Sequence, residues 1–172
     1  MTAPAAKPTT DSSLEAHGLT IGVVSARWNR DIVERLERGA RDAVAECGAR
    51  AVTASVPGAF ELPYAARTIA RSGRVDAVVV VGAVIRGETS HYELVSEGCA
   101  NGVMSVQLST GIPVGFGVVT VENHDQALER SSDEHNVGRD AALAAIEMAV
   151  LSHTWTVRGP RRPIDAEGDE AG

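Results

Sequence analysis

Short apolar runs alternate with amphipathic stretches along most of the chain, and this alternation restricts the fold more than any other feature. Four runs of strand length are separated by segments in which apolar residues recur at helical spacing. The expected strands are 19–25, 49–56, 75–81 and 113–121, and the expected helices are 31–47, 59–71, 92–108, 123–131 and 138–153. Apolar strands that alternate with helices are typical of a parallel sheet covered on both faces. The sequence therefore predicts one α/β domain, a three-layer sandwich around a four-stranded parallel sheet.

The segment 31–47 shows the helical pattern most clearly. Its apolar residues recur at positions 32, 36, 40, 43, 44 and 47, which share one face of a helix. Cys47 belongs to this stripe, and Cys99 belongs to a similar stripe in 92–108. We expect both cysteines to be small core residues of a protein in a reducing compartment.

Compositional bias marks both ends of the chain. Residues 1–17 are rich in Ala, Pro, Thr and Ser, and residues 156–172 combine Pro and Gly with charged side chains. Segments of this kind bury too little apolar surface to fold. We therefore expect a disordered arm at 1–17, a folded domain at 18–155 and a disordered tail at 156–172.

Charge and hydropathy argue against several classes of protein. The formal net charge of −7 does not suit a basic nucleic-acid-binding face. No apolar run approaches the roughly 20 residues of a membrane span, and the first residues lack the apolar core of a secretory signal. The sequence also has no CxxC pattern and no Cys/His cluster suited to metal. We expect a cytoplasmic protein that binds neither nucleic acid nor membranes.

Polar and aromatic side chains follow the predicted strands. Trp28 and Asn29 follow the first strand, Phe60 and Glu61 follow the second, and the stretch RGETSH at 86–91 follows the third. The carboxyl ends of parallel strands meet at one edge of the sheet, and ligands of such sheets bind outside that edge. The sequence therefore predicts a ligand crevice built from these residues.

The stretch 86–91 carries the most chemistry. Thr89 or Ser90 can cap the helix that follows, and free N–H groups at a helix start bind anions. Histidine exchanges protons in the physiological pH range, so His91 can shuttle protons. The same residues are also compatible with a capped helix that carries a solvent-facing histidine, and the motif alone does not choose between the two.

The remaining candidates are equally open when each is taken alone. Trp28 can stack on a planar heterocycle or cover the sheet edge, and Phe60 has the same ambiguity. Glu61 can bind a ligand or complement a helix dipole, and Arg130 suits the end of a short helix with or without a ligand. His124 and His135 are expected at the surface. Together these residues suit a planar heterocycle and a phosphorylated small molecule.

Six motifs together resemble the lumazine synthase family over roughly residues 19 to 150. They occur in the family's order and at its spacing, as VVSARWN (23–29), VPGAFELP (56–63), GAVIRGETSHYE (82–93), GIPVGFGVVTVEN (111–123), QALERS (126–131) and NVGRDAA (136–142). The resemblance implies a flavodoxin-like fold. It also implies condensation of 5-amino-6-(D-ribitylamino)uracil with 3,4-dihydroxy-2-butanone 4-phosphate to 6,7-dimethyl-8-ribityllumazine, phosphate and water. It implies no cofactor and no metal.

The resemblance also assigns roles to residues of this chain. Trp28 corresponds to the aromatic residue that stacks on the pyrimidine ring. Ala59, Phe60 and Glu61 would hold the ribityl chain, with Glu61 accepting hydroxyl hydrogen bonds. The pyrimidine site would be lined by the end of the third strand, at Ala83, Val84 and Ile85.

A second group of residues is assigned to the phosphate and to proton transfer. Glu88 and Thr89 would bind the phosphate, and His91 would transfer protons. Phe116 and Arg130 match residues that the neighbouring subunit donates, with Arg130 facing the phosphate. The family forms homopentamers, and some members assemble twelve of them into a 60-subunit icosahedral shell. The sequence leaves the choice between pentamer and shell open.

Two departures from the family pattern are compatible with other functions. Val137 stands where the family often has a lysine, and Glu88 adds a negative charge beside the phosphate site. A non-catalytic relative that binds a ribityl-heterocycle or forms a shell would tolerate both changes. An archaeal-type riboflavin synthase is a further alternative, but that reaction needs no phosphate site.

Overall fold

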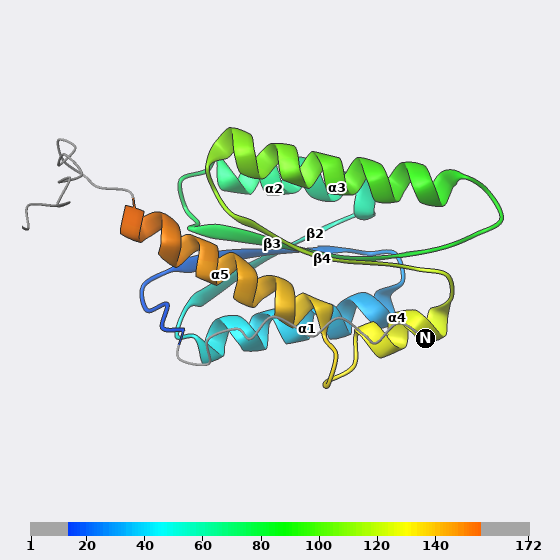
Figure 1. The fold of residues 1–172 in the computed structure, drawn as a ribbon, viewed down its shortest axis with the longest axis horizontal. Coiled ribbons are helices and arrows are strands. Elements are labelled where there is room, and N and C mark those ends of the chain that lie inside the picture. The colour runs from blue at the N-terminus through cyan, green and yellow to red at the C-terminus, as the bar shows by residue number, and fades with distance from the viewer. Residues whose placement is uncertain (1–13, 156–172) are drawn as a thin grey trace, which may run out of the picture.

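The computed structural model describes residues 14–155, which form a sandwich of helices on both faces of a parallel sheet (Figure 1). The strands are β1 (Thr20–Ala26), β2 (Arg50–Val56), β3 (Ala77–Ile85) and β4 (Val114–Val121). They pair in the order β2-β1-β3-β4, and each pair is parallel. The predicted α/β class and the flavodoxin-like three-layer arrangement are confirmed.

The helices divide between the two faces of this sheet. They are α1 (Arg30–Glu46), the 3₁₀ turn η1 (Ala59–Glu61), α2 (Leu62–Ala70), α3 (His91–Thr110), α4 (His124–Arg130) and α5 (Val137–Trp155). Helices α2 and α3 cover one face, and α1, α4 and α5 cover the other (Figure 1). This division follows from the side-chain alternation along β3, where Val78 and Val80 face α2 and α3 while Val79 and Val81 face α1 and α5.

The helical stripe predicted in 31–47 is confirmed by burial. All six of its apolar residues are buried, namely Ile32, Leu36, Ala40, Ala43, Val44 and Cys47. Cys99 is also buried, and its burial raises the pKa of the thiol to about 11. Both cysteines are free, and a protonated, buried thiol is a packing group.

Three predicted elements differ in detail from the structure. Strand β3 does not end near Val81 but continues to Ile85, because Gly82–Ile85 pair with Val118–Val121 of β4. The helix expected at 59–71 begins as the separate turn η1, and α2 starts at Leu62 with Pro63 in its first turn. Strand β2 lies at the sheet edge and is mostly exposed, so the expected cover on both faces does not extend to it.

Two glycines allow α5 to lie directly on its neighbours. A Cβ atom placed on Gly115 of β4 would lie 2.1 Å from the carbonyl oxygen of Ala141 in α5, and one placed on Gly138 would lie 2.1 Å from the carbonyl oxygen of Leu36 in α1. Asn136 caps the start of α5 by accepting a hydrogen bond from Arg139 N, and it donates a second one to Arg35 O. The position of α5 is therefore fixed by backbone contact.

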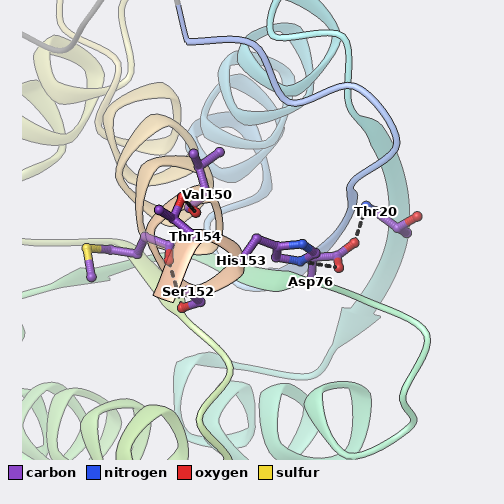
Figure 2. Close-up of polar contacts among 7 residues, drawn as sticks. Thr20, Asp76, Val150, Ser152, His153 and Thr154 are labelled. Carbon is purple, nitrogen blue, oxygen red and sulfur yellow. Dashed lines mark hydrogen bonds and ion pairs between the residues drawn. The ribbon is translucent and has the colours of Figure 1, made fainter. Parts of the chain in front are cut away.

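The other end of α5 is attached to the amino ends of two strands (Figure 2). Asp76, just before β3, accepts a hydrogen bond from the backbone N–H of Thr20 at 2.7 Å. Its second carboxylate oxygen lies 3.0 Å from Nε2 of His153. One carboxylate thus joins β1, β3 and the last turn of α5 at the edge of the sheet opposite the predicted crevice.

Residues 14–17, which were predicted to belong to a disordered N-terminal arm, contact the folded domain. Ala16 is buried against the core, and its N–H donates to Cys47 O at 2.8 Å, so residues 14–17 pack on the domain. The remaining parts of the two predicted disordered segments, 1–13 and 156–172, lie outside the described residues. Within 14–155, no helix combines the length and apolar character needed to cross a membrane.

Candidate active site

A cleft of about 610 Å³ opens at the carboxyl ends of β1 and β3. These strands are neighbours, but β1 leads to α1 on one face of the sheet while β3 leads to α3 on the other. The strand order reverses at this point, and α/β proteins bind ligands where it reverses. The cleft is lined by Trp28, Asn29, Gly58, Ala59, Phe60, Glu61, Ala83, Val84, Ile85, His91, Leu94 and Val95.

Trp28 stands at the mouth of the cleft, with 73% of its surface exposed. The next residue, Asn29, has φ 55° and ψ 51° and is the only residue other than glycine with positive φ in the described part of the chain. Asparagine tolerates this left-handed conformation better than most residues. Its side chain donates a hydrogen bond to Ala83 O in β3 at 2.9 Å. Asn29 therefore fixes the turn that presents Trp28.

The absence of a side chain at Gly58 brings Trp28 and Glu61 together. A Cβ atom placed on Gly58 would lie 3.2 Å from both the Trp28 ring and the Glu61 carboxylate. The ring of Phe60 lies against α3, where a Cβ atom placed on Gly98 would approach it to 3.0 Å. An exposed indole, an exposed phenyl ring and a carboxylate thus border one apolar cavity. Such a wall suits a flat ring that carries a hydroxylated chain.

His91 is the first residue of α3 and lines the same cleft. The predicted capping of this helix is only weakly present. Ser90 holds the N-cap position, but its side chain makes no capping hydrogen bond, and the contact from His91 N to Thr89 Oγ1 is long at 3.5 Å. The N–H groups at the start of α3 are therefore not strongly engaged by side chains, as a site for an anion requires.

Glu88 and Thr89 do not line the cleft of their own chain. Both are exposed in the loop before α3, and a Cβ atom placed on Gly87 would meet no atom within 4 Å. The loop follows directly on Ile85 and leads to His91, so it lies along the border of the cleft.

Phe116 and Arg130 also lie outside this cleft. Phe116 is in β4 with 37% of its surface exposed. Arg130 ends α4 and lines a second, more polar cavity of about 360 Å³ with Thr120, Gln126 and Val137. A single chain therefore brings together the predicted pyrimidine and ribityl residues with His91, but it does not bring Phe116 and Arg130 to them.

Arg86 is the most strongly engaged charged side chain at this edge. Its guanidinium pairs with Glu93 in the first turn of α3 and, at 2.8 Å, with Glu122 after β4. It also lies 4.2 Å from the centroid of the Tyr92 ring. The hydrogen bond from Arg86 lowers the pKa of the Glu93 carboxyl, and the Glu93 and Glu122 carboxylates raise the pKa of the guanidinium.

His124 forms a second polar contact nearby. Its Nε2 lies 2.8 Å from Asp31 in the first turn of α1, and this hydrogen bond lowers the pKa of the aspartate. His124 and His135 are both exposed, which confirms the surface prediction for each. Among residues 14–155, no three His, Cys, Asp or Glu side chains are grouped to hold a metal ion.

Three of the lining residues, Gly58, Leu94 and Val95, are not among the residues that the sequence predicts for the site. Leu94 and Val95 lie about one helical turn after His91, and the apolar pattern alone predicts only that they belong to a helix. Asn29 belongs to the predicted crevice, but its role in holding the turn is not predicted. An asparagine directly after the first strand was the available signal, but its partner, the carbonyl of Ala83, lies 54 residues away.

Comparison with known proteins identifies one family over most of the chain. The 6,7-dimethyl-8-ribityllumazine synthase family matches residues 18–153. The 6,7-dimethyl-8-ribityllumazine synthase of Deinococcus radiodurans is 46% identical over 145 residues, covering 82% of this chain and 94% of that protein. The proteins of the same name from Thermococcus gammatolerans and Deinococcus deserti are each 45% identical, covering 83% and 82% of this chain and 94% and 93% of their own lengths. The chain belongs to the 6,7-dimethyl-8-ribityllumazine synthase family.

Proposed function

We infer that this chain condenses 5-amino-6-(D-ribitylamino)uracil with 3,4-dihydroxy-2-butanone 4-phosphate to form 6,7-dimethyl-8-ribityllumazine. Phosphate and water are the other products. The family match over residues 18–153 supports this reaction, and the cleft that joins Trp28, Glu61 and His91 is the observation that carries it. All three relatives described above carry the name of this synthase.

The reaction consists of steps that this cleft is suited to assist. The 5-amino group attacks the ketone, and loss of water gives an imine. Loss of a proton from the neighbouring carbon then expels phosphate, and the enol that results becomes a ketone. The ribitylamino nitrogen attacks that ketone, and loss of a second water closes the ring. Each step moves a proton, and His91 is the histidine among the cleft residues.

The arrangement of the cleft supports a binding mode for the pyrimidine. The heterocycle stacks on Trp28 and lies along the end of β3, at Ala83, Val84 and Ile85. The ribityl chain extends past Ala59 and Phe60, where the Glu61 carboxylate accepts its hydroxyl hydrogen bonds. Holding both substrates in one cleft supplies much of the rate, because it removes the entropy cost of their encounter.

The phosphate end of the site is proposed to be shared between subunits. Glu88 and Thr89 border the cleft through the loop before α3, and the Glu88 side chain points to solvent while its backbone serves the phosphate. Phe116 and Arg130 come from a neighbouring protomer, which is consistent with their position outside the cleft. Val137 lines the cavity that contains Arg130, so Arg130 there acts without the lysine frequent in the family.

A homopentamer is the assembly that we propose. Helix α3 carries three large apolar side chains that are more than half exposed, Leu94, Met104 and Leu108, and a contact between copies would bury such a face. A 60-subunit shell built from pentamers is the larger alternative, and sedimentation of the purified protein distinguishes the two. The two free, buried cysteines are consistent with the proposed cytoplasmic location.

A lumazine-forming assay tests the reaction directly. Purified protein is mixed with both substrates, and the fluorescence of the product is followed against the spontaneous condensation. A rate well above the spontaneous rate supports the enzyme. A rate equal to it, with the pyrimidine still bound, supports the non-catalytic relative.

Replacement of Trp28 tests the proposed stacking. Trp28→Ala should raise the KM for the pyrimidine roughly tenfold, since stacking of a base on an aromatic side chain contributes about 1–3 kcal/mol. Trp28→Phe should retain most of the affinity. Trp155→Ala is the matched control, because Trp155 is 78% exposed and does not line the cleft. Equal KM values for Trp28→Ala and the control would contradict the binding mode.

Mixed assemblies test the shared site. Arg130→Ala alone should raise the KM for the phosphorylated ketone, and His91→Ala alone should lower kcat. If one protomer supplies His91 and its neighbour supplies Arg130, co-assembly of the two variants restores both residues at roughly a quarter of the sites in a head-to-tail ring. Activity of the co-assembled protein should then exceed that of the two variants assembled separately. Equal activities would place both residues in one subunit's site.

A further inference from the structure

We propose that Arg86 is a positioning residue for the reaction inferred above, because its side chain holds the loop 87–90 and His91 in place. The inference therefore rests on the proposed function. Arg86 directly follows β3, and its backbone N–H donates to Val121 O at 2.9 Å, which extends the β3–β4 pairing by one residue. The start of the loop is thus anchored to the sheet.

The side chain of Arg86 reaches across the loop to its far end. It pairs with Glu93 and covers Tyr92, and both residues belong to the first turn of α3, directly after His91. It also pairs with Glu122 at 2.8 Å, at the point where β4 ends. One side chain therefore ties the carboxyl ends of two strands to the helix that begins with His91.

The loop has few other attachments. Glu88, Thr89 and Ser90 are exposed, and two long hydrogen bonds lie at the helix start, from His91 N to Thr89 Oγ1 at 3.5 Å and from Leu94 N to Ser90 O at 3.4 Å. The environment of Glu93 also indicates that the first turn of α3 depends on Arg86. Its Oε2 atom is buried and has no hydrogen-bond partner among the other described residues, so the ion pair between Oε1 and Arg86 is the contact that orients this carboxylate. Loss of Arg86 would release the first turn of α3.

The geometry distinguishes this role from direct binding of phosphate. The guanidinium is shared between two carboxylates and an aromatic ring, and arginine suits such a site because its planar, five-donor group can bridge two acceptors. Lysine cannot reproduce that arrangement, although it keeps the charge. The positions of Trp28 and Glu61 do not depend on Arg86, because they are set by Asn29 and by the turn at Gly58.

The first experiment is steady-state kinetics of Arg86→Gln and Arg86→Lys. Arg86→Gln should lower kcat about tenfold or more, since small displacements of reacting groups have effects of this size. The KM for the phosphorylated ketone should rise, and the KM for the pyrimidine should not change. Arg86→Lys should recover little of the loss. Wild-type kinetics for Arg86→Gln would overturn the proposal, and full activity of Arg86→Lys would show that only the charge matters.

The double variant Glu93→Gln/Glu122→Gln separates positioning from direct phosphate binding. It removes both carboxylate partners and leaves the guanidinium free. If Arg86 acts by positioning, the double variant should lose kcat as Arg86→Gln does. If Arg86 binds phosphate itself, the KM for the ketone should fall or stay unchanged, and the proposal is wrong.

Arg139→Gln is the control for loss of an arginine–glutamate pair. Arg139 makes a bidentate contact with Glu46, at 3.0 and 2.5 Å, that joins α5 to α1 away from the cleft. The Arg139→Gln variant should have the same melting temperature as Arg86→Gln, but its kcat and KM values should be those of the wild type. Wild-type protein that forms no lumazine would refute the proposed function, whereas active wild-type protein with an unaffected Arg86→Gln variant would refute only the role of Arg86.

Discussion

His91→Ala should lower kcat about 100-fold, since general acid–base catalysis contributes effects of this size or larger. The KM values of both substrates should change little, because the variant retains Trp28, Glu61 and Arg130. The fold should be intact, since no side-chain hydrogen bond of His91 supports α3 in the described part of the chain. Stopped-flow or steady-state measurement of lumazine fluorescence, with sedimentation of the variant, checks both expectations.

His135→Ala is the matched control for this variant. His135 is also exposed but lies in the turn between α4 and α5, and it does not line the cleft. It should retain the wild-type kcat. A His91→Ala protein that fails to assemble would make His91 a structural residue. An assembled variant with wild-type kcat would assign the proton transfers to another group or to water.

Gly115→Ala should cause a large loss of stability. The added Cβ would lie 2.1 Å from the carbonyl oxygen of Ala141 and 3.1 Å from the Cβ of Ala145, so α5 would have to move away from β4. A backbone clash cannot be relieved by a rotamer change. We expect a loss of about 3 kcal/mol, which lowers the melting temperature by about 6–12 °C in a protein of this size.

Gly87→Ala is the control for stability. A Cβ atom at position 87 meets no atom within 4 Å, and this glycine does not have positive φ, so the melting temperature should not fall. Strand propensity alone predicts that Gly115→Ala raises the stability, since glycine weakens a strand interior. An unchanged melting temperature for Gly115→Ala would mean that α5 does not lie as close to the sheet as described.

Much of the fold was predictable because the spacing of apolar residues and the positions of Pro and Gly indicate the same elements along this chain. The stripe of buried residues on α1, the break at Pro57 and Gly58, and the apolar run of β3 each identify an element without reference to the rest of the chain. The ends of elements were less predictable. Gly82 resembles the end of a strand, but pairing with β4 carries β3 to Ile85, and a pairing partner is not visible in the local sequence.

The site was predictable in part for a related reason. The residues that follow parallel strands must meet at one edge, so Trp28, Phe60, Glu61 and His91 could be grouped before the structure was known. The family motifs then assigned roles to them. The contacts of the Arg86 side chain with Glu93 and Glu122 could not be predicted from local sequence. Glu122 directly follows β4, and it comes close to Arg86 only because β4 pairs with β3.

The sequence alone determined the fold class, the order of the elements and the family, because these depend on local patterns and on motif spacing. The tertiary structure decided which residues share a cleft, how Asn29 is held by Ala83, and how closely α5 lies on Gly115. It also separated Phe116 and Arg130 from the cleft of their own chain. The physical reason is that these features are contacts between segments far apart in the chain, whose energies depend on distances that no local pattern specifies.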